Sequence, residues 1–239
     1  QDAARVQAWQ TAWTDPAVVG VVGGRGGYGA LRLLPHLQWG DSPKWLVGYS
    51  DLTALQWALA ARGWGSLHGS VLKDLPNQPA AAIEAVFGWL DGSLPALTLQ
   101  GQGLVAGQTH GWLLPGNLTV ATHLLGTPYC PALKEAILAW EDVNELPYQV
   151  DRLLTHWRLT GKLATVRGIA LGRFAAEAPT QPSLTWGEVW RDRLGDLGVP
   201  VVTDLPFGHG GPNLPLPLGA PATLDGTQGT LVVQSPLVC

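Results

Sequence analysis

Residues 44–63 have the sequence KWLVGYSDLTALQWALAARG. The apolar run at 44–47 predicts a short strand, and the turn-forming residues at 48–51 predict a tight bend after it. Residues 52–62 then repeat apolar side chains at helical spacing and stop at Gly63. A strand, a glycine turn and a helix in this order predict one unit of a parallel α/β sheet.

The preceding segment has the same organisation. Residues 3–13 predict a helix that ends before Pro16, and the Val-rich run at 17–22 predicts a buried parallel strand. A glycine-rich loop at 23–29 follows, and residues 30–37 predict the next helix. Two such units in succession favour an α/β fold for the N-terminal part.

The remaining chain predicts a mixture of strands and helices. We expect helices at 80–90, 148–159 and 186–197 and strands at 133–140, 166–174 and 201–203. We expect β structure and turns at 91–130, a Pro/Gly loop at 205–219 and a closing hairpin at 224–234. The change of character places a domain boundary within 75–92.

Composition excludes several classes of protein. The 239 residues carry a net charge of −4 without a basic block, which disfavours a nucleic-acid partner. Hydrophobic residues make up 46%, enough for a core, but no apolar run has the length of a membrane helix. The two cysteines, Cys130 and Cys239, form neither a disulfide framework nor a metal-ligand pair, which favours a reducing compartment.

Ser50 is the first candidate for chemistry. A nucleophile between a strand end and a helix start sits on an exposed bend, where backbone N–H groups face a developing oxyanion. The pattern Gly48-Tyr49-Ser50-Asp51-Leu52 has Leu where G-x-S-x-G has Gly, which argues against an ordinary lipase or esterase. The alternative is that Ser50 or Asp51 only caps the helix.

The loop at 23–29 has two interpretations. It could cradle an anion at a helix N-terminus, or it could be a tight turn that needs positive φ. No Gly-Lys-Ser/Thr follows it, and no acidic residue stands at the distance of a dinucleotide fingerprint.

A histidine and a carboxylate complete a possible triad. His209 lies in a glycine-flanked loop, Glu141 follows an apolar strand-like run, and the order Ser50, Glu141, His209 matches that of α/β-hydrolases. A turn histidine and a turn carboxylate are the alternatives. No histidine forms a close-spaced ligand pair with another His or a Cys, which disfavours zinc. The six histidines are His36, His68, His110, His123, His156 and His209.

The chain resembles the LD-carboxypeptidase family of serine peptidases, which includes muropeptide LD-carboxypeptidases and microcin-immunity peptidases. The segments that carry the resemblance are 25–29 with 32–35, 48–55, 141–152, and 208–209 with 216–219.

The resemblance implies a two-domain α/β fold. A flavodoxin-like parallel-sheet domain at 1–88 would carry the nucleophile, and a mixed α/β domain at 89–239 would carry the other triad residues. The family's first strand and helix would lie before Gln1, so the N-terminal sheet is expected to be incomplete in this chain.

The resemblance also assigns roles to residues. Ser50 matches the nucleophile, His209 the general base and Glu141 the acid that orients it. The oxyanion hole would be formed by the N–H of Asp51 and an N–H in the Gly26–Gly27 pair. No metal and no organic cofactor is implied.

Substrate contacts are predicted at four further positions. Arg25 and Arg152 are candidates for gripping a terminal carboxylate, because Arg pairs with carboxylates through two parallel hydrogen bonds. Surface ion pairs are the alternative for both arginines. Tyr28 and Asn117 are the other candidate substrate-binding residues.

These observations predict a cytoplasmic serine carboxypeptidase in peptidoglycan recycling, and the resemblance implies a homodimer. It would release a terminal D-amino acid from an L-centre in a murein tetrapeptide, without a nucleic-acid or membrane partner. One alternative is a microcin-immunity-type amidase that cleaves a peptidyl-nucleotide. The other is a non-catalytic peptide-binding pseudoenzyme.

Overall fold

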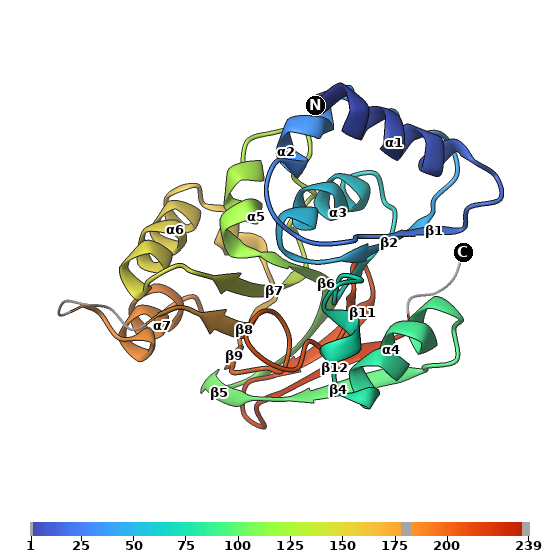
Figure 1. Cartoon of the computed structure of the whole chain (residues 1–239). Helices are drawn as coiled ribbons and strands as arrows, with labels where there is room; N and C mark the ends of the chain where they lie inside the picture. Colours follow the sequence, from blue (N-terminus) through green and yellow to red (C-terminus); the bar gives the residue numbers. More distant parts are fainter. Residues whose placement is uncertain (1, 178–182, 236–239) are drawn as a thin grey trace.

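The computed structural model describes residues 2–177 and 183–235. Within them, the chain forms two sheets with helices packed around both (Figure 1). The smaller sheet has the strand order β1-β2-β3-β10. Its strands are β1 (Gly20–Val22), β2 (Trp45–Gly48), β3 (Leu67–His68) and β10 (Leu216–Pro217).

The smaller sheet is parallel in its N-terminal part. Strand β2 pairs parallel to β1 and β3, whereas β10 comes from late in the chain and pairs antiparallel to β3. Gln56 in the adjoining helix donates from Nε2 to the Gly48 and Leu67 carbonyls, so a buried side chain ties β2 to β3. The helices of this part are α1 (Asp2–Thr14), α2 (Ala30–Leu33) and α3 (Thr53–Ala60).

The larger sheet has a parallel centre and antiparallel margins. In the described residues its order is β4-β12-β11-β6-β7-β8-β9-β5, and β6 to β9 are mutually parallel. The strands are β4 (Ala96–Gln100), β5 (Gln102–Val105), β6 (Gln108–Asn117), β7 (Ala136–Val143), β8 (Gly168–Ala175), β9 (Val201–Thr203), β11 (Pro221–Asp225) and β12 (Thr230–Gln234).

Helices cover different parts of this sheet. The helices α6 and α7 pack against each other on one side of the molecule, and α4 lies on the other side (Figure 1). The bounds are α4 (Ala80–Leu90), α5 (Leu118–Leu124), α6 (Pro147–Leu159) and α7 (Trp186–Leu194).

Tryptophans fill the core where the two sheets meet. Trp57 of α3 contacts Trp157 of α6 edge-on, and Trp157 packs against Trp140 of β7, all three fully buried. Trp57 also donates from Nε1 to the Pro115 carbonyl at 2.9 Å. The indole ring therefore fills space and satisfies a backbone acceptor at the same contact.

The predicted α/β fold is confirmed. The helix at 80–90 and the strand at 201–203 have the expected bounds. The helix predicted at 30–37 continues from α2 into a 3₁₀ turn at Leu34–His36, because Pro35 lacks the N–H that an α-helix needs.

One prediction about β structure is confirmed only in part, and another is wrong. Only Gly20–Val22 of the run at 17–22 forms a strand, and Val22 is 46% exposed because β1 is at the sheet edge. Residues 118–124, expected within β structure and turns, form helix α5. The side chain of Asn117 caps this helix by accepting from the Val120 N–H at 3.1 Å.

Smaller differences concern loops, cysteines and membrane spans. The loop expected at 205–219 contains β10, and Glu141 lies inside β7 rather than after a strand. Cys130 is a free thiol, whereas Cys239 lies outside the described residues. Across the part of the chain that the structure describes, no helix is long and apolar enough to cross a bilayer.

Gly116→Ala is expected to destabilise the packing of strand β6 against helix α3. A Cβ at Gly116 would lie 2.8 Å from both Thr53 Cγ2 and Trp57 Nε1, which are buried and have little room to shift. We expect urea denaturation to show a free energy of unfolding lower by about 1–3 kcal/mol.

Gly187→Ala on α7 is the matched control for that substitution. A Cβ there would meet only the flexible end of Arg191 at 3.4 Å, and Ala favours a helix over Gly by about 1 kcal/mol. We expect unchanged or increased stability. Equal stability of Gly116→Ala and the wild type would contradict the packing argument.

Candidate active site

Ser50 stands on a strained bend at the end of β2. It opens a 3₁₀ turn, Ser50–Leu52, and has a φ of 63°, a left-handed conformation that non-glycine residues rarely adopt. Such strain is concentrated at functional positions, where the surrounding structure maintains it. The bend has the location expected for a nucleophile between a strand and a helix.

Two glycines explain why Leu replaces the second Gly of the familiar elbow pattern. A Cβ at Gly23 would lie 2.2 Å from Leu52 Cδ1, and a Cβ at Gly48 would lie 2.3 Å from the same atom. The Leu52 side chain therefore occupies space that the two glycines leave open. Gly23 and Gly48, at the ends of β1 and β2, thus make room for the leucine that replaces the second Gly of G-x-S-x-G.

The glycine loop lies directly against Ser50. A Cβ at Gly26 would be 3.1 Å from both Cβ and Oγ of Ser50, so only a glycine allows this approach without displacement. Asp51 Oδ2 accepts a hydrogen bond from the Ala30 N–H at 2.9 Å and ties the end of the loop to the elbow. The structure thus brings together Ser50, Asp51 and Gly26.

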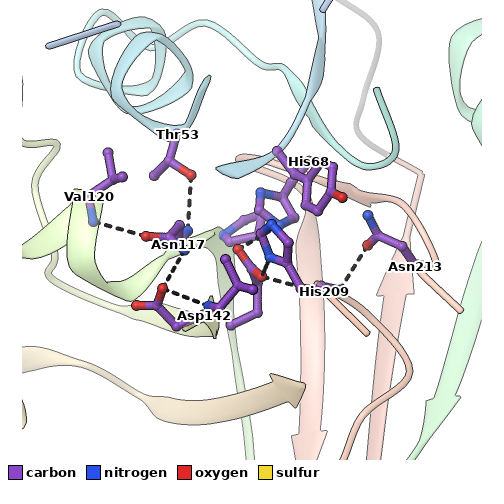
Figure 2. Close-up of polar contacts among 12 residues, drawn as sticks. Thr53, His68, Asn117, Val120, Asp142, His209 and Asn213 are labelled. Carbon is purple, nitrogen blue, oxygen red and sulfur yellow. Dashed lines mark hydrogen bonds and ion pairs between the residues drawn. The ribbon is translucent and has the colours of Figure 1, made fainter. Parts of the chain in front are cut away.

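Glu141 and His209 form a buried pair. Glu141 is fully buried on β7, and its Oε2 lies 2.5 Å from His209 Nδ1. The His209 backbone N–H also donates to Oε2, at 3.2 Å. Figure 2 shows His209 with Asn117 and Asp142 to its left and Asn213 to its right.

Gly208 makes the approach of the loop possible. It has a φ of 90°, and a Cβ there would lie 2.4 Å from Glu141 Cβ. Its N–H donates to Asn213 Oδ1 at 2.8 Å. Both conformation and space therefore require glycine before His209.

The environment of His209 favours its protonated form. Burial alone lowers its pKa, but the hydrogen bond to Glu141 and the charge of that carboxylate outweigh burial, so the net pKa is raised. The ring also lies 4.5 Å, centroid to centroid, from the ring of Tyr49, the residue before Ser50. Tyr49 is held in turn by a hydrogen bond to Asp74 Oδ2.

The pair and the serine are neighbours without a direct bond. In the described residues, no hydrogen bond joins Ser50 Oγ to His209, and Tyr49 forms the contact between them. Long or unformed catalytic hydrogen bonds are common in structures without substrate.

His68 is a neighbour of the pair that sequence reasoning missed. It is fully buried at the end of β3, and its Nε2 lies 4.0 Å from Glu141 Oε1. Burial lowers its pKa to about 4, against the opposing effect of Glu141, so the ring is neutral at pH 7. The sequence signal for His68 is its place at the end of a strand that runs parallel to β2, because the carboxyl ends of parallel strands lie along the same edge of a sheet.

Asp142, the residue after Glu141, accepts hydrogen bonds from neighbouring residues. Its Oδ1 accepts from Asn117 Nδ2 at 2.8 Å, and its Oδ2 accepts from the N–H and hydroxyl of Thr119. Burial and the charge of Glu141 raise the pKa of Asp142 to about 6, in spite of these donors. Asn117 is buried, and its amide group bonds within the fold.

The other predicted substrate residues lie at the surface. Arg25 and Tyr28 are exposed in the glycine loop, and Arg152 is exposed on α6. The Arg152 guanidinium lies 5.8 Å from the ring centroid of Tyr148 on the same helix. Among the residues described, no group of three or more His, Cys, Asp or Glu could hold a metal ion.

Comparison with known proteins gives the family. Residues 1–69 match the LD-carboxypeptidase N-terminal domain, and residues 110–224 match the LD-carboxypeptidase C-terminal domain. The chain belongs to the LD-carboxypeptidase family.

Relatives of this LD-carboxypeptidase-family chain align with nearly all of it and with about three quarters of their own length. A Synechocystis protein with a provisional carboxypeptidase name is 52% identical over 96% of this chain and 77% of its own length. The murein tetrapeptide carboxypeptidase of Pseudomonas aeruginosa is 30% identical over 94% of this chain and 78% of its own length.

Solved structures agree with the fold. The crystal structure of muramoyltetrapeptide carboxypeptidase from Oxalobacter formigenes has a TM-score of 0.88 and 30% identity, covering 98% of this chain and 85% of its own. The microcin C7 self immunity protein MccF has a TM-score of 0.82 at 21% identity, covering 98% and 81%. The second likeness concerns the fold alone.

The neutral state of buried His68 predicts how stability depends on pH. Between pH 6.5 and 4 the unfolded chain binds a proton that the folded chain does not, so stability falls as pH falls. The slope from this group is at most about 1.4 kcal/mol per pH unit. Asp142 acts oppositely, because its stabilisation is present below pH 3.8 and is lost as pH rises through about 6.

His68→Gln removes the first contribution and leaves the second. We expect urea denaturation between pH 4.5 and 7 to show a shallower loss of stability on acidification in the variant than in the wild type. Identical slopes would mean that His68 takes up its proton in the folded state as readily as in the unfolded chain.

Proposed function

We propose that this protein is a serine carboxypeptidase that hydrolyses the bond between an L-centre and a terminal D-amino acid in a murein tetrapeptide. The observation that carries the proposal is the buried Glu141–His209 pair beside the strained Ser50 elbow. Family membership and relatives named as murein tetrapeptide and muramoyltetrapeptide carboxypeptidases support the substrate class.

The proposed chemistry starts with proton transfer from Ser50 to His209. A serine hydroxyl is a weak nucleophile until a neighbouring base accepts its proton. With Nδ1–H donating to Glu141, His209 presents its unprotonated Nε2 as that base. Glu141 stabilises the imidazolium that forms, and His209 then returns the proton to the leaving amine. Water, deprotonated by His209, then hydrolyses the acyl group bound to Ser50 Oγ and releases the shortened peptide and the serine hydroxyl.

The tetrahedral intermediate requires donors for its oxyanion. We assign this role to the N–H of Asp51 and to an N–H of the Gly26–Gly27 pair, which the packing of Gly26 on Ser50 supports. Donors fixed in advance stabilise the developing charge without reorganisation. Each is expected to contribute about 3–4 kcal/mol to transition-state stabilisation.

We propose that exposed residues of the glycine loop and of α6 bind the substrate. Arg25 and Tyr28 project from the glycine loop that contains Gly26, and Arg152 lies on α6. An arginine there would bind the terminal carboxylate through paired hydrogen bonds. The Asn117 amide donates one N–H to Asp142 and accepts from Val120, so a substrate contact would use its second N–H or its second lone pair.

Three further expectations accompany this proposal and rest on sequence and family resemblance. They are a division into domains at 1–88 and 89–239, a homodimeric state, and a cytoplasmic location. The peptide is the proposed small-molecule partner, and no cofactor enters the proposed mechanism.

Substitution of each triad residue should abolish turnover of the peptide. We expect Ser50→Ala and His209→Asn to lower kcat by at least about 10³-fold, and Glu141→Gln by about 10³- to 10⁴-fold through loss of the correct tautomer. The assay is mass-spectrometric detection of D-alanine released from murein tetrapeptide. A wild-type rate in Ser50→Ala would exclude the mechanism.

Controls separate this proposal from the alternatives. His36→Asn, a surface substitution of the same type as His209→Asn, should keep the wild-type rate. A peptidyl-nucleotide assayed in parallel distinguishes amidase activity. Labelling of Ser50 by a fluorophosphonate probe would argue against a pseudoenzyme.

Gly26→Ala tests the proposed oxyanion hole. The added Cβ would lie 3.1 Å from Ser50 Cβ and Oγ and would displace the loop or the serine. We expect kcat to fall by about 10²- to 10³-fold, as for loss of one oxyanion donor. Gly24→Ala is the control, because nothing lies within 4 Å of its Cβ, and its kcat should change less than about twofold. Equal effects of both substitutions would contradict the assignment.

A further inference from the structure

Two buried polar groups face each other across the contact between the sheets without a hydrogen bond. His68 comes from β3 of the smaller sheet, and Glu141 comes from β7 of the larger one. Both side chains are fully buried, and 4.0 Å separates His68 Nε2 from Glu141 Oε1. In the described part of the chain, neither His68 ring nitrogen nor Glu141 Oε1 has a hydrogen-bond partner.

The surroundings hold both groups in place. The His68 backbone pairs with Gly48 on one side and Leu216 on the other, in the interior of the sheet. Glu141 is held by the Nδ1 and the backbone N–H of His209 through Oε2 alone. Oε1 is therefore the free acceptor of the carboxylate, and His68 Nε2 is the ring nitrogen that faces it.

We propose that His68 is a positioning residue that donates its Nε2–H to Glu141 Oε1 during catalysis. A neutral imidazole carries one N–H, and a carboxylate oxygen accepts it. Closing the 4.0 Å separation to hydrogen-bond length requires a shift of about 1 Å. This inference rests on the proposed function, in which Glu141 orients His209.

The contact would fix the rotation of the carboxylate. With Oε1 bonded to His68, Oε2 remains directed at His209 Nδ1, and the base keeps the tautomer that leaves Nε2 free for Ser50. Without the donor, the terminal torsion of Glu141 is broad, so the carboxylate plane can turn away from the orientation that best accepts the His209 Nδ1–H. His68 would thus act on the reaction through Glu141 without touching the substrate.

Several other ionisable groups lie around His68, Glu141 and His209, and they come from different elements. Tyr49 lies edge-on to the His68 ring, with the centroids 6.2 Å apart, and it also packs against His209. Asp142 neighbours Glu141 on β7, and Asp74 is bonded to Tyr49. Asp142 and Asp74 both act electrostatically on His209. The variants of His68 that test the proposal therefore keep both carboxylates.

The direction of a pH effect follows from charge. When His209 is neutral and Glu141 is ionised, the pair has a net charge of −1, and when His209 is protonated its net charge is zero. A donor to Oε1 stabilises the negative state. Loss of that donor therefore makes the pair bind its proton more tightly and moves the acid limb of kcat/KM to higher pH.

The test compares His68→Gln with His68→Asn. Both replacements are amides, but the longer Gln places an N–H near the position of Nε2, whereas Asn falls short of Oε1. We expect His68→Asn to lower kcat by about 10- to 100-fold with little change in KM, as for loss of one hydrogen bond to a charged group. Its acid limb should rise by about 0.5–1 pH unit, and His68→Gln should restore both properties toward the wild type.

A second measurement does not depend on turnover. NMR titration of histidine-labelled protein follows the ionisation of His209, assigned by the signal that His209→Asn removes. The His209 titration should move to higher pH in His68→Asn and stay near the wild type in His68→Gln. Circular dichroism and urea denaturation at pH 7 establish that each variant is folded.

The outcomes decide between a positioning role and a packing role. Wild-type kcat and an unmoved His209 titration in His68→Asn would overturn the inference. Equal loss in both amide variants, with an unmoved acid limb, would also overturn it and leave only packing. Absence of peptide hydrolysis by the wild type would instead refute the proposed function, and the NMR comparison would still test the contact with Glu141.

Discussion

The burial of one carboxylate constrains the rest of the site. An ionised carboxylate removed from water is very costly unless donors or opposite charges surround it. Glu141 lies fully buried in a central strand, and its strongest partner comes from a loop that reaches it only because residue 208 is glycine. The loop geometry, the raised pKa of His209 and the position of Asn213 all depend on satisfying Glu141.

Much of the fold was predictable because its local signals agree with its packing. The helix at 80–90 is an apolar segment after a proline, and β2 with its turn combines a short apolar run with glycine. Helix α5 was not predictable in the same way. Its sequence contains the β-branched Thr119, Val120 and Thr122, which favour strands, and the Asn117 cap together with the Thr119–Asp142 bond overrides that preference.

The site divides into residues with a sequence signal and residues without one. Ser50, Glu141 and His209 stand in motifs whose order along the chain predicted them, and the structure brings the last two into contact. His68 has no comparable motif. Its place depends on which side chains of two different sheets become neighbours of Glu141, and spacing along one chain does not encode that distance. Asp142 follows Glu141 directly on β7, but its raised pKa depends on burial, which the sequence alone does not show.

Strand β10 has a consequence for how the protein is made. It adds to the smaller sheet from a part of the chain synthesised long after β3, and it follows the His209 loop by only a few residues. A nascent chain on the ribosome therefore carries Ser50 well before the segment with the histidine has emerged. Docking of that single segment adds β10 to the smaller sheet and places His209 beside Glu141 in one event, so the Ser50 elbow gains this neighbour only after residues 208–217 have been made.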